Sequence, residues 1–386
     1  MGHKIVFYVN SLDPCSGGVA RVTHMISSSL MAYGWTCYAI VWSDMAMIDN
    51  HTHYTEVLTE KGDTYFSASG IVDFCRSKKI DVLVNTEGAV PHNLSLLRRI
   101  KLETDTRIVS CCHSTPLFIE GLSDFHSNTG LHPLISETLY SIYKKLFFKR
   151  IYKKRIKEIF RLSQLYIVLD KSYVAEFIRY NGITERQSAV RYIHNPSVWR
   201  DTFDWAPKRN IVLYVGRLSR EKHPERLLEI WNSFYPRHRD WKLLIVGDGP
   251  MKGDLELKIE ENEIKNVLLL GNTPDIDRFY KVARLILLTS DYEGWPMSIV
   301  EAMGHGVVPI VYDTFSALHV MIVHGKDGYI VGKCRRRQFP VRFTEYMEEA
   351  IKNYSRLSQS AHGSIQKYNI KDIAKEWEAL LQIIVK

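Results

Sequence analysis

Long apolar segments are missing from this 386-residue sequence, and their absence excludes one class of protein. No apolar run approaches the roughly 20 residues that a helix needs to cross a bilayer. The start of the chain also lacks the pattern of a secretory leader, because it turns polar directly after the apolar residues 5–9. We therefore expect a cytoplasmic protein without a membrane-spanning helix.

Cysteines are few, and their positions follow no known pattern. None of the six cysteines forms a pair with metal-ligand spacing, and Cys111 and Cys112 lie in an apolar run typical of a strand. In a chain without a leader, such cysteines favour free thiols in a reducing compartment. The sequence therefore predicts neither a disulfide framework nor a cysteine-bound metal.

Positive charge is concentrated in one segment. The formal net charge is +8, and residues 144–161 account for all of it with nine Lys or Arg and one Glu. Residues 142–162 predict an amphipathic helix with an apolar face that contains Phe148, Tyr152, Ile156 and Ile159. Another face carries Lys145, Lys149, Lys153, Lys157 and Arg161. Such a helix suits an anionic membrane surface, and an ordinary surface helix with a buried apolar stripe explains the pattern equally well. Nucleic-acid binding has no motif in its support.

Short apolar runs alternate with helical segments along the chain, which favours an α/β fold with parallel sheets. The runs that predict strands are residues 4–9, 37–41, 80–84, 107–112, 164–169, 193–196, 211–215, 241–246, 266–270, 284–288 and 307–311. The polar residues 197–209 predict a linker, so we expect two Rossmann-like domains, residues 1–197 and 198–365, that face each other across a cleft. The apolar spacing near the end of the chain predicts a helix at about residues 366–386.

Residues 290–312 contain the most informative pattern in the sequence. A turn with Gly294 and Pro296 follows a predicted strand and leads into a helix, and such turns lie where open α/β sheets bind ligands. The free amides and positive dipole of the helix start attract phosphate. Glu293 and Glu301 would repel phosphate, but carboxylates accept hydrogen bonds well from hydroxyls. A ligand with both groups, such as a sugar nucleotide, fits this pattern.

The spacing E-x7-E within EGWPMSIVEAMGHGVVPIV closely resembles the nucleotide-sugar motif of the retaining glycosyltransferases of family 4, the group 1 transferases. The resemblance implies the GT-B fold and a nucleotide-sugar donor, with UDP-sugars as the commonest choice. It implies that Glu301 binds the ribose and that Glu293 binds sugar hydroxyls near the reaction centre. The backbone around the helix start would bind the sugar and phosphate through Gly294, Trp295, Met297, Ser298 and Ile299. Neither a metal nor a cofactor is expected.

Other segments match the same family more loosely. Gly17 and Gly18 stand at a strand-to-helix turn, where the family closes a loop over the donor phosphates. Arg217 and Lys222 occupy the position at which the family binds the pyrophosphate, and two cations there would neutralise a departing diphosphate. By the same resemblance, His113 lies near the donor sugar. The family also reads the nucleobase near Thr273, which together with Pro274 predicts a helix start.

Two further motifs indicate other chemistry only weakly. Asp275 and Asp277 match the D-x-D motif of metal-dependent glycosyltransferases, but aspartates in the first turn of a helix are better explained by the helix dipole. Residues 247–250 begin a dinucleotide-binding fingerprint, which Pro250 and a displaced third glycine interrupt. We therefore expect no catalytic metal at the first motif, and the second disfavours a dehydrogenase.

The resemblance predicts a retaining, metal-independent hexosyltransferase. Its partners would be a nucleotide sugar and a glycan or lipid-linked acceptor used in cell-surface polysaccharide, lipopolysaccharide or glycolipid synthesis. Residues 142–162 would make peripheral contact with the inner face of the cell membrane. The alternatives are a nucleotide-sugar epimerase or hydrolase of the same fold, and a sugar-nucleotide-binding protein without turnover.

Overall fold

The computed structural model describes residues 2–14, 17–42, 53–59, 68–89, 93–116, 137–197 and 207–386, without the side chains of Thr59 and of residues 137–148. The chain forms two compact units. Unit 1 comprises Met1–Pro196 together with Ile370–Lys386, and unit 2 comprises Ser197–Asn369. Each unit contains one sheet whose paired strands are parallel, which confirms the predicted fold class of two Rossmann-like units.

The sheet of unit 1 has its first strand near the middle. In sheet order its strands are β3 (Glu56–Thr59), β2 (Thr36–Val41), β1 (Lys4–Val9), β4 (Val82–Asn85), β5 (Arg107–Cys111), β6 (Leu165–Val168) and β7 (Val190–Tyr192). From β1 the chain proceeds toward one edge through β2 and β3, and then returns to β4 on the other side of β1. The order therefore reverses between β1 and β4, and ligands of such sheets bind outside the carboxyl ends of the strands at this point.

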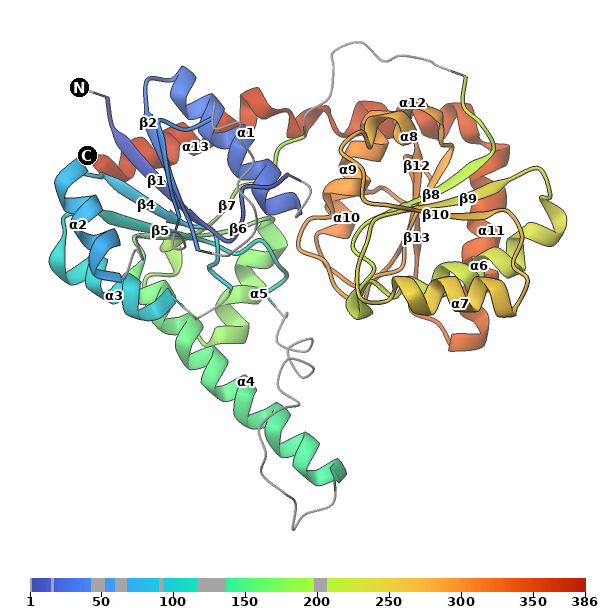
Figure 1. Cartoon of the computed structure of the whole chain (residues 1–386), viewed down its shortest axis with the longest axis horizontal. Coiled ribbons are helices and arrows are strands. Elements are labelled where there is room, and N and C mark those ends of the chain that lie inside the picture. The colour runs from blue at the N-terminus through green and yellow to red at the C-terminus, as the bar shows by residue number, and fades with distance from the viewer. Residues whose placement is uncertain are drawn as a thin grey trace. The chain divides into compact units, whose positions relative to one another are not determined.

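Six α-helices of unit 1 lie within the part of the chain that the structure describes. They are α1 (Gly18–Ala32), α2 (Ala68–Lys78), α3 (Leu94–Glu103), α4 (Glu137–Leu162), α5 (Lys171–Asn181) and α13 (Ile370–Val385). The last helix of the chain, α13, packs against the first, α1, as Figure 1 shows in red and blue. The Trp35 indole donates a hydrogen bond to Glu378 on α13 and so ties this helix to the start of β2. No described helix combines the length and the apolar composition that a bilayer crossing needs.

The sheet of unit 2 repeats the strand order of unit 1. Its strands are β10 (Val267–Gly271), β9 (Lys242–Val246), β8 (Ile211–Val215), β11 (Leu285–Leu288), β12 (Val308–Tyr312) and β13 (Tyr329–Val331). The order reverses between β8 and β11, so these strands correspond to β1 and β4 of unit 1. All five residues of β8 and all four of β11 are buried, as expected for strands covered on both faces.

Helices of unit 2 complete its core. They are α6 (Glu225–Phe234), α7 (Lys252–Glu261), α8 (Asp277–Val282), α9 (Met297–Gly304), α10 (Leu318–Met321), α11 (Phe339–Lys352) and α12 (Tyr354–Ser364). Trp231 on α6 and Phe343 on α11 are buried in one cluster with β8 and β11. Each such side chain contributes about 1.5–3 kcal/mol by leaving water, so this core fixes the strand ends that carry the loops described below.

Most predicted strands are present, and the strand predicted at residues 193–196 is wrong. The edge strand β7 ends at Tyr192, and the Ile193 amide adds a single further bond to the Val168 carbonyl at 3.0 Å. Pro196 has no amide hydrogen with which to extend the pairing. The chain divides after Pro196 and after Asn369.

Candidate active site

The loops that follow β8, β9 and β10 are joined backbone to backbone at the carboxyl edge of unit 2. The Gly216 amide donates to the Val246 carbonyl at 3.1 Å, and the Gly247 amide donates to the Gly271 carbonyl at 2.9 Å. Gly247 has φ 142°, and a Cβ there would lie 1.9 Å from the Gly216 carbonyl oxygen. The G-x-G motif therefore serves the close approach of two loops in this chain.

The loop after β8 is fixed against the end of β11. Its one-turn 3₁₀ helix covers Arg220–Lys222, and His223 follows with φ 47°, an uncommon value for a residue with a side chain. The Thr289 hydroxyl holds this turn by donating to the carbonyls of Lys222 at 3.0 Å and His223 at 3.2 Å. These bonds place the Lys222 side chain beside the turn that follows β11.

Lys222 and Glu293 form the most prominent ion pair of this site. The ammonium of Lys222 lies 2.7 Å from both carboxylate oxygens of Glu293, and the Ser290 hydroxyl donates to the same carboxylate at 2.7 Å. The Glu293 side chain is 9% exposed and that of Lys222 is 23% exposed. Partial burial strengthens the attraction between the two charges, so the carboxylate is both oriented and neutralised. The structure thus brings together two site residues predicted separately. The third, Arg217, lies on the same loop with an exposed side chain.

The turn after β11 leads into α9, which begins at Met297 after Pro296. The amides of Met297 and Ser298 lie in the first turn, where a helix has no internal acceptor for them. The predicted free amide of Ile299 is wrong, because it donates to the Pro296 carbonyl at 3.0 Å. The Trp295 side chain is buried with its ring 5.0 Å from that of Tyr368, so the ring belongs to the packing of unit 2.

Glu301 is oriented by a residue that the motif does not contain. The Tyr280 hydroxyl on α8 donates to the Glu301 carboxylate at 3.0 Å, and the Tyr280 ring is fully buried. This ring stacks on the His305 imidazole with centroids 5.8 Å apart, and His305 lies 3.4 Å from the Asp277 carboxylate. Burial lowers the pKa of His305. No sequence motif contains Tyr280, so its contact with Glu301 could not be predicted from the sequence.

The segment around Thr273 differs from the sequence prediction. Helix α8 begins at Asp277 and not at Pro274, so Thr273 does not cap it. The Thr273 hydroxyl instead accepts the amide of Asp275 at 3.3 Å in a local turn. Only Asp277 of the D-x-D motif therefore lies in the helix. Among the residues that the structure describes, no group of three or more His, Cys, Asp or Glu is placed to hold a metal ion.

Three residues predicted for the donor site lie in unit 1. Gly17 precedes α1 with φ 152°, which favours glycine, and Gly18 is the first residue of that helix. His113 follows β5, and burial lowers its pKa to about 4, although a hydrogen bond with Asn195 acts in the opposite direction. The imidazole is therefore neutral at pH 7, which suits a polar binding role.

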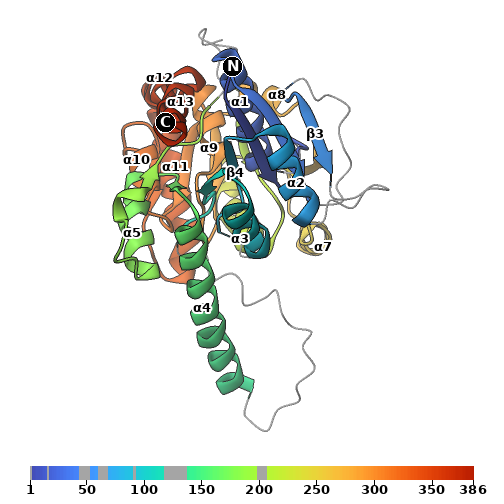
Figure 2. The ribbon, with the colours of Figure 1, turned by 90° about the vertical axis from the view of Figure 1, so that its left-hand side faces the viewer.

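The basic helix is present as α4, and its C-terminal half packs on unit 1. Ile156 and Ile159 are buried there, so this part of the apolar face is not available to a membrane. The side chains of Lys145 and Phe148 lie outside the described residues. In Figures 1 and 2 the N-terminal half of α4 extends away from the sheet of its unit.

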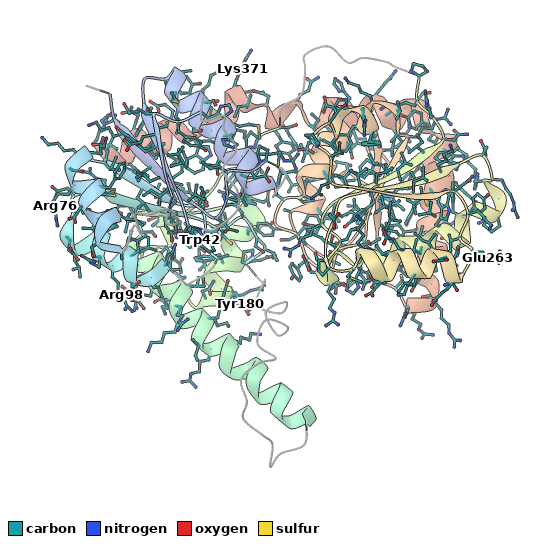
Figure 3. All side chains as sticks on the ribbon, viewed as in Figure 1. Trp42, Arg76, Arg98, Tyr180, Glu263 and Lys371 are labelled. Carbon is teal, nitrogen blue, oxygen red and sulfur yellow. The ribbon has the colours of Figure 1, made fainter. Side chains whose placement is uncertain are left out.

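Lysines of α4 gather around the end of α5. Lys149 and Lys153 lie over the Tyr180 ring at 5.3 and 4.1 Å from its centroid, and Lys157 donates to the Gly182 carbonyl at 2.8 Å. Figure 3 shows Tyr180 beside α4. Partial burial and the charge of Lys149 lower the pKa of Lys153. These residues adjoin a hollow of about 470 Å³ that is lined by Arg150, Ile151, Lys153, Lys154, Lys157 and Asn181.

Solved structures with the same architecture identify the fold. The crystal structure of HepE from Anabaena in complex with UDP and glucose aligns over 99% of this chain and all of its own, with a TM-score of 0.74 and 16% identity. This chain has the GT-B fold. In this chain the Lys222–Glu293 pair and the start of α9 lie at the carboxyl edge of the C-terminal sheet.

Sequence comparisons connect the C-terminal part of this GT-B chain with glycosyltransferases. Residues 197–363 match the family described as glycosyl transferases group 1. The amylovoran biosynthesis glycosyltransferase AmsD of Erwinia amylovora is 30% identical over 57% of this chain and 62% of its own length. An α-1,4-N-acetyl-D-galactosaminyltransferase of Campylobacter jejuni, which acts on an undecaprenol-linked saccharide, is 26% identical over 55% of this chain and 57% of its own. The matched region covers less than two thirds of either relative.

Proposed function

We propose that this chain is a retaining, metal-independent glycosyltransferase that transfers a hexose from a UDP-sugar to a glycan or lipid-linked acceptor. The observation that carries the proposal is the Lys222–Glu293 pair beside the start of α9, at the point where the strand order of unit 2 reverses. A cation, a carboxylate and free helix amides together match a ligand that has both phosphates and hydroxyls. The similarity to group 1 transferases supports the same activity.

The donor would be held both by carboxylates that accept hydrogen bonds and by backbone amides that donate them. Glu301, oriented by Tyr280, would accept the ribose hydroxyls, and Glu293 would accept hydroxyls of the sugar. The backbone of Gly294 and Trp295 and the amides of Met297 and Ser298 would bind the sugar and the phosphate nearest to it. Backbone near Thr273 would contact the nucleobase.

The chemistry follows from how the leaving group is stabilised. Arg217 and Lys222 would neutralise the diphosphate as its bond to the anomeric carbon breaks. The acceptor hydroxyl oxygen would form its bond to that carbon from the same face and pass its proton to the departing phosphate oxygen. Because the bond forms on the face from which the diphosphate departs, the anomeric configuration is retained. A neutral His113 would contribute a hydrogen bond and not a charge.

A membrane partner fits the basic part of α4. Lys153 and Lys157 line the hollow beside α5, and Lys149 lies with Lys153 over the Tyr180 ring. A phosphate of an anionic or diphosphate-linked lipid matches their charge. The chain would then act on the inner face of the membrane. Sedimentation with phosphatidylglycerol vesicles should show binding that weakens with salt and that is lost when Lys149, Lys153 and Lys157 are all replaced by glutamine. Equal binding to phosphatidylcholine vesicles would contradict this contact.

A donor screen tests the proposed activity. UDP-glucose, UDP-galactose, UDP-N-acetylglucosamine and UDP-N-acetylgalactosamine should raise the melting temperature, with GDP-mannose as the control. A donor at a hundred times its Kd stabilises by about 2.7 kcal/mol, which is readily measured. Slow release of UDP without acceptor, accelerated when a sugar acceptor is added, would support a transferase. Rapid release without acceptor would favour a hydrolase, and donor isomerisation would favour an epimerase. Binding without any turnover would favour a non-catalytic protein.

A further inference from the structure

Unit 1 carries a carboxylate at its own switch point, between β1 and β4. Glu87 lies two residues beyond the end of β4, in the turn formed by residues 86–88. This is the edge at which an open α/β sheet of this strand order binds ligands. No sequence motif marks the residue, and its position follows only from the strand order.

The turn that carries Glu87 is anchored by a buried polar side chain. Asn85 is fully buried, and its amide donates to the Ser110 hydroxyl at 3.2 Å. The Asn85 side-chain oxygen accepts from the Glu87 amide at 3.2 Å and from the Asn93 side chain at 2.7 Å. Because a buried amide is costly unless its hydrogen bonds are made, these bonds hold the turn in one conformation.

Close backbone packing fixes the turn from the other side. The Gly88 amide donates to the Cys111 carbonyl at 2.9 Å, and a Cβ on Gly88 would lie 2.6 Å from that oxygen. The Thr86 hydroxyl donates to the Tyr8 carbonyl at 3.0 Å and ties the turn to β1. Glu87 therefore has a fixed backbone, as a residue that positions a ligand requires.

The carboxyl group of Glu87 bridges the two strand ends of the switch point. It accepts a hydrogen bond from the backbone amide of Asn10, the first residue after β1. Glu87 is half-buried, and burial raises the pKa of its carboxyl group. A single backbone amide leaves most of the acceptor positions of a carboxylate for other donors.

A second polar residue follows the strand end to which Glu87 is bridged. Glu87 is bridged to Cys112, and His113 is the next residue along the chain. The Nδ1 atom of His113 is buried and has no hydrogen-bond partner among the described residues. A buried nitrogen without a protein partner requires an explanation, and a hydroxyl group of a bound ligand would supply the missing hydrogen bond.

Unit 2 has the same arrangement at its donor site. There the carboxylate of Glu293 follows β11, the strand that corresponds to β4, and it also receives hydrogen bonds from a loop of the central strand. Thr289 plays the part of Thr86, because each hydroxyl donates to a carbonyl of the neighbouring strand or its loop. Each unit thus places one carboxylate at its switch point.

We propose that Glu87 and His113 form the binding site for the hydroxyl groups of the acceptor sugar. Glu87 accepts a hydrogen bond from one hydroxyl, and the Nδ1 atom of His113 bonds a neighbouring one. This inference rests on the proposed glycosyltransferase activity and assigns its acceptor side. The ligand class is a neutral sugar or a sugar attached to a lipid, because no described cation contacts Glu87 as Lys222 contacts Glu293.

The test uses Glu87→Gln, which removes the charge but keeps an oxygen that can accept the Asn10 amide. The matched control is Asp81→Asn. Asp81 lies at the opposite end of the same strand pair, where it accepts the backbone amide of Lys4 at 2.7 Å. Both variants lose one carboxylate that ties β1 to β4, and only one of them lies at the ligand edge.

The probes are octyl β-glucoside, octyl β-galactoside and octyl N-acetyl-α-galactosaminide, measured with UDP present by saturation-transfer NMR and in transfer assays with the donor from the screen. Glu87→Gln should raise the KM for the accepted glycoside about tenfold or more and leave donor KM and donor hydrolysis unchanged. Asp81→Asn should have the wild-type values of glycoside KM, donor KM and donor hydrolysis.

Several outcomes would overturn the acceptor site. These are unchanged glycoside binding in Glu87→Gln, an equal loss in Asp81→Asn, or a parallel loss of donor hydrolysis. The same holds if the wild-type chain binds UDP and none of the three glycosides. A wild-type chain that neither binds nor turns over a UDP-sugar would instead contradict the proposed function, so the two failures can be distinguished.

Discussion

In unit 2 the loops after β8 and β11 meet through an ammonium and a carboxylate, whereas in unit 1 the corresponding loops after β1 and β4 meet through a carboxylate and a backbone amide. The strand order is the same in both sheets. The difference therefore lies in what the loops carry, and it matches the proposed ligands. A diphosphate needs a cation beside the carboxylate, while a neutral sugar needs only hydrogen-bond acceptors and donors.

Removing the cation of unit 2 should give the largest effect. Lys222→Ala is expected to abolish transfer, with a fall in the transfer rate of about a hundredfold to a thousandfold or more. The reason is that the leaving diphosphate loses the ammonium that stabilises its charge. The fold should persist, with a stability loss of about 1–3 kcal/mol, since the buried Glu293 carboxylate is left without its partner. Transfer rates and thermal unfolding measure the two effects.

A double variant separates the two roles of this pair. Lys222→Met combined with Glu293→Gln removes both charges, so it should recover part of the lost stability and none of the activity. Wild-type turnover in Lys222→Ala or Glu293→Ala would contradict the roles assigned to these residues.

The next largest effects are expected for glycine-to-alanine variants in the closely packed loops of the two units, and the quantity affected is the free energy of unfolding. Gly247→Ala meets both a left-handed φ and an oxygen 1.9 Å from the new Cβ, so a loss of about 2–4 kcal/mol is expected. Gly88→Ala meets the Cys111 backbone, with the carbonyl oxygen nearest at 2.6 Å, but it has no left-handed φ and should lose less. Gly253→Ala on α7 is the control, since nothing lies within 4 Å of its Cβ and alanine favours a helix by about 1 kcal/mol. Equal stability of all three variants by denaturant titration would exclude close packing as the cause.

The smallest expected effect concerns His223, which follows Lys222. The Glu225 carboxylate, with help from Asp291, raises the pKa of His223 above its ordinary value of 6.5, while burial and Arg226 oppose the shift. Between pH 6.5 and the raised pKa, His223 therefore keeps a proton in the folded protein that it releases in the unfolded chain. The resulting stability, about 1 kcal/mol or less for such partly exposed pairs, is fully present below pH 6.5 and disappears as the pH rises through the raised pKa.

Melting temperatures measured from pH 6 to 9 test this sign. His223→Gln should reduce the fall in stability across that range, whereas His194→Gln, a variant in unit 1, should leave it in place. An unchanged pH profile in His223→Gln would show that the histidine is not charged in the folded protein.

The parallel strands could be predicted because burial on both faces leaves nearly continuous apolar runs such as residues 4–9 and 211–215. Two edge strands could not. Strand β3 begins with a glutamate and has four residues, and β13 has only three, so neither gives a recognisable run. The wrong start of α8 has a similar origin, because Thr273 and Pro274 fit a helix start and a preceding turn equally well.

Site residues within the motif could be named from the sequence, but their contacts could not. Lys222 and Glu293 are 71 residues apart, and only the pairing of β8 with β11 places them side by side. Tyr280 and Glu87 lie outside any motif. Their roles depend on which atoms the fold places within hydrogen-bond distance, and a one-dimensional pattern does not contain that information.

The return of α13 to the first unit has a consequence for how the molecule forms during synthesis. Every residue of unit 2 leaves the ribosome before residues 370–386 do, so unit 2 can complete its core while unit 1 still lacks the helix that covers α1. Until then the surface beneath α13, including the Trp35 indole, is exposed to water. A released chain truncated after residue 369 should therefore present a finished second unit attached to a first unit that binds chaperones.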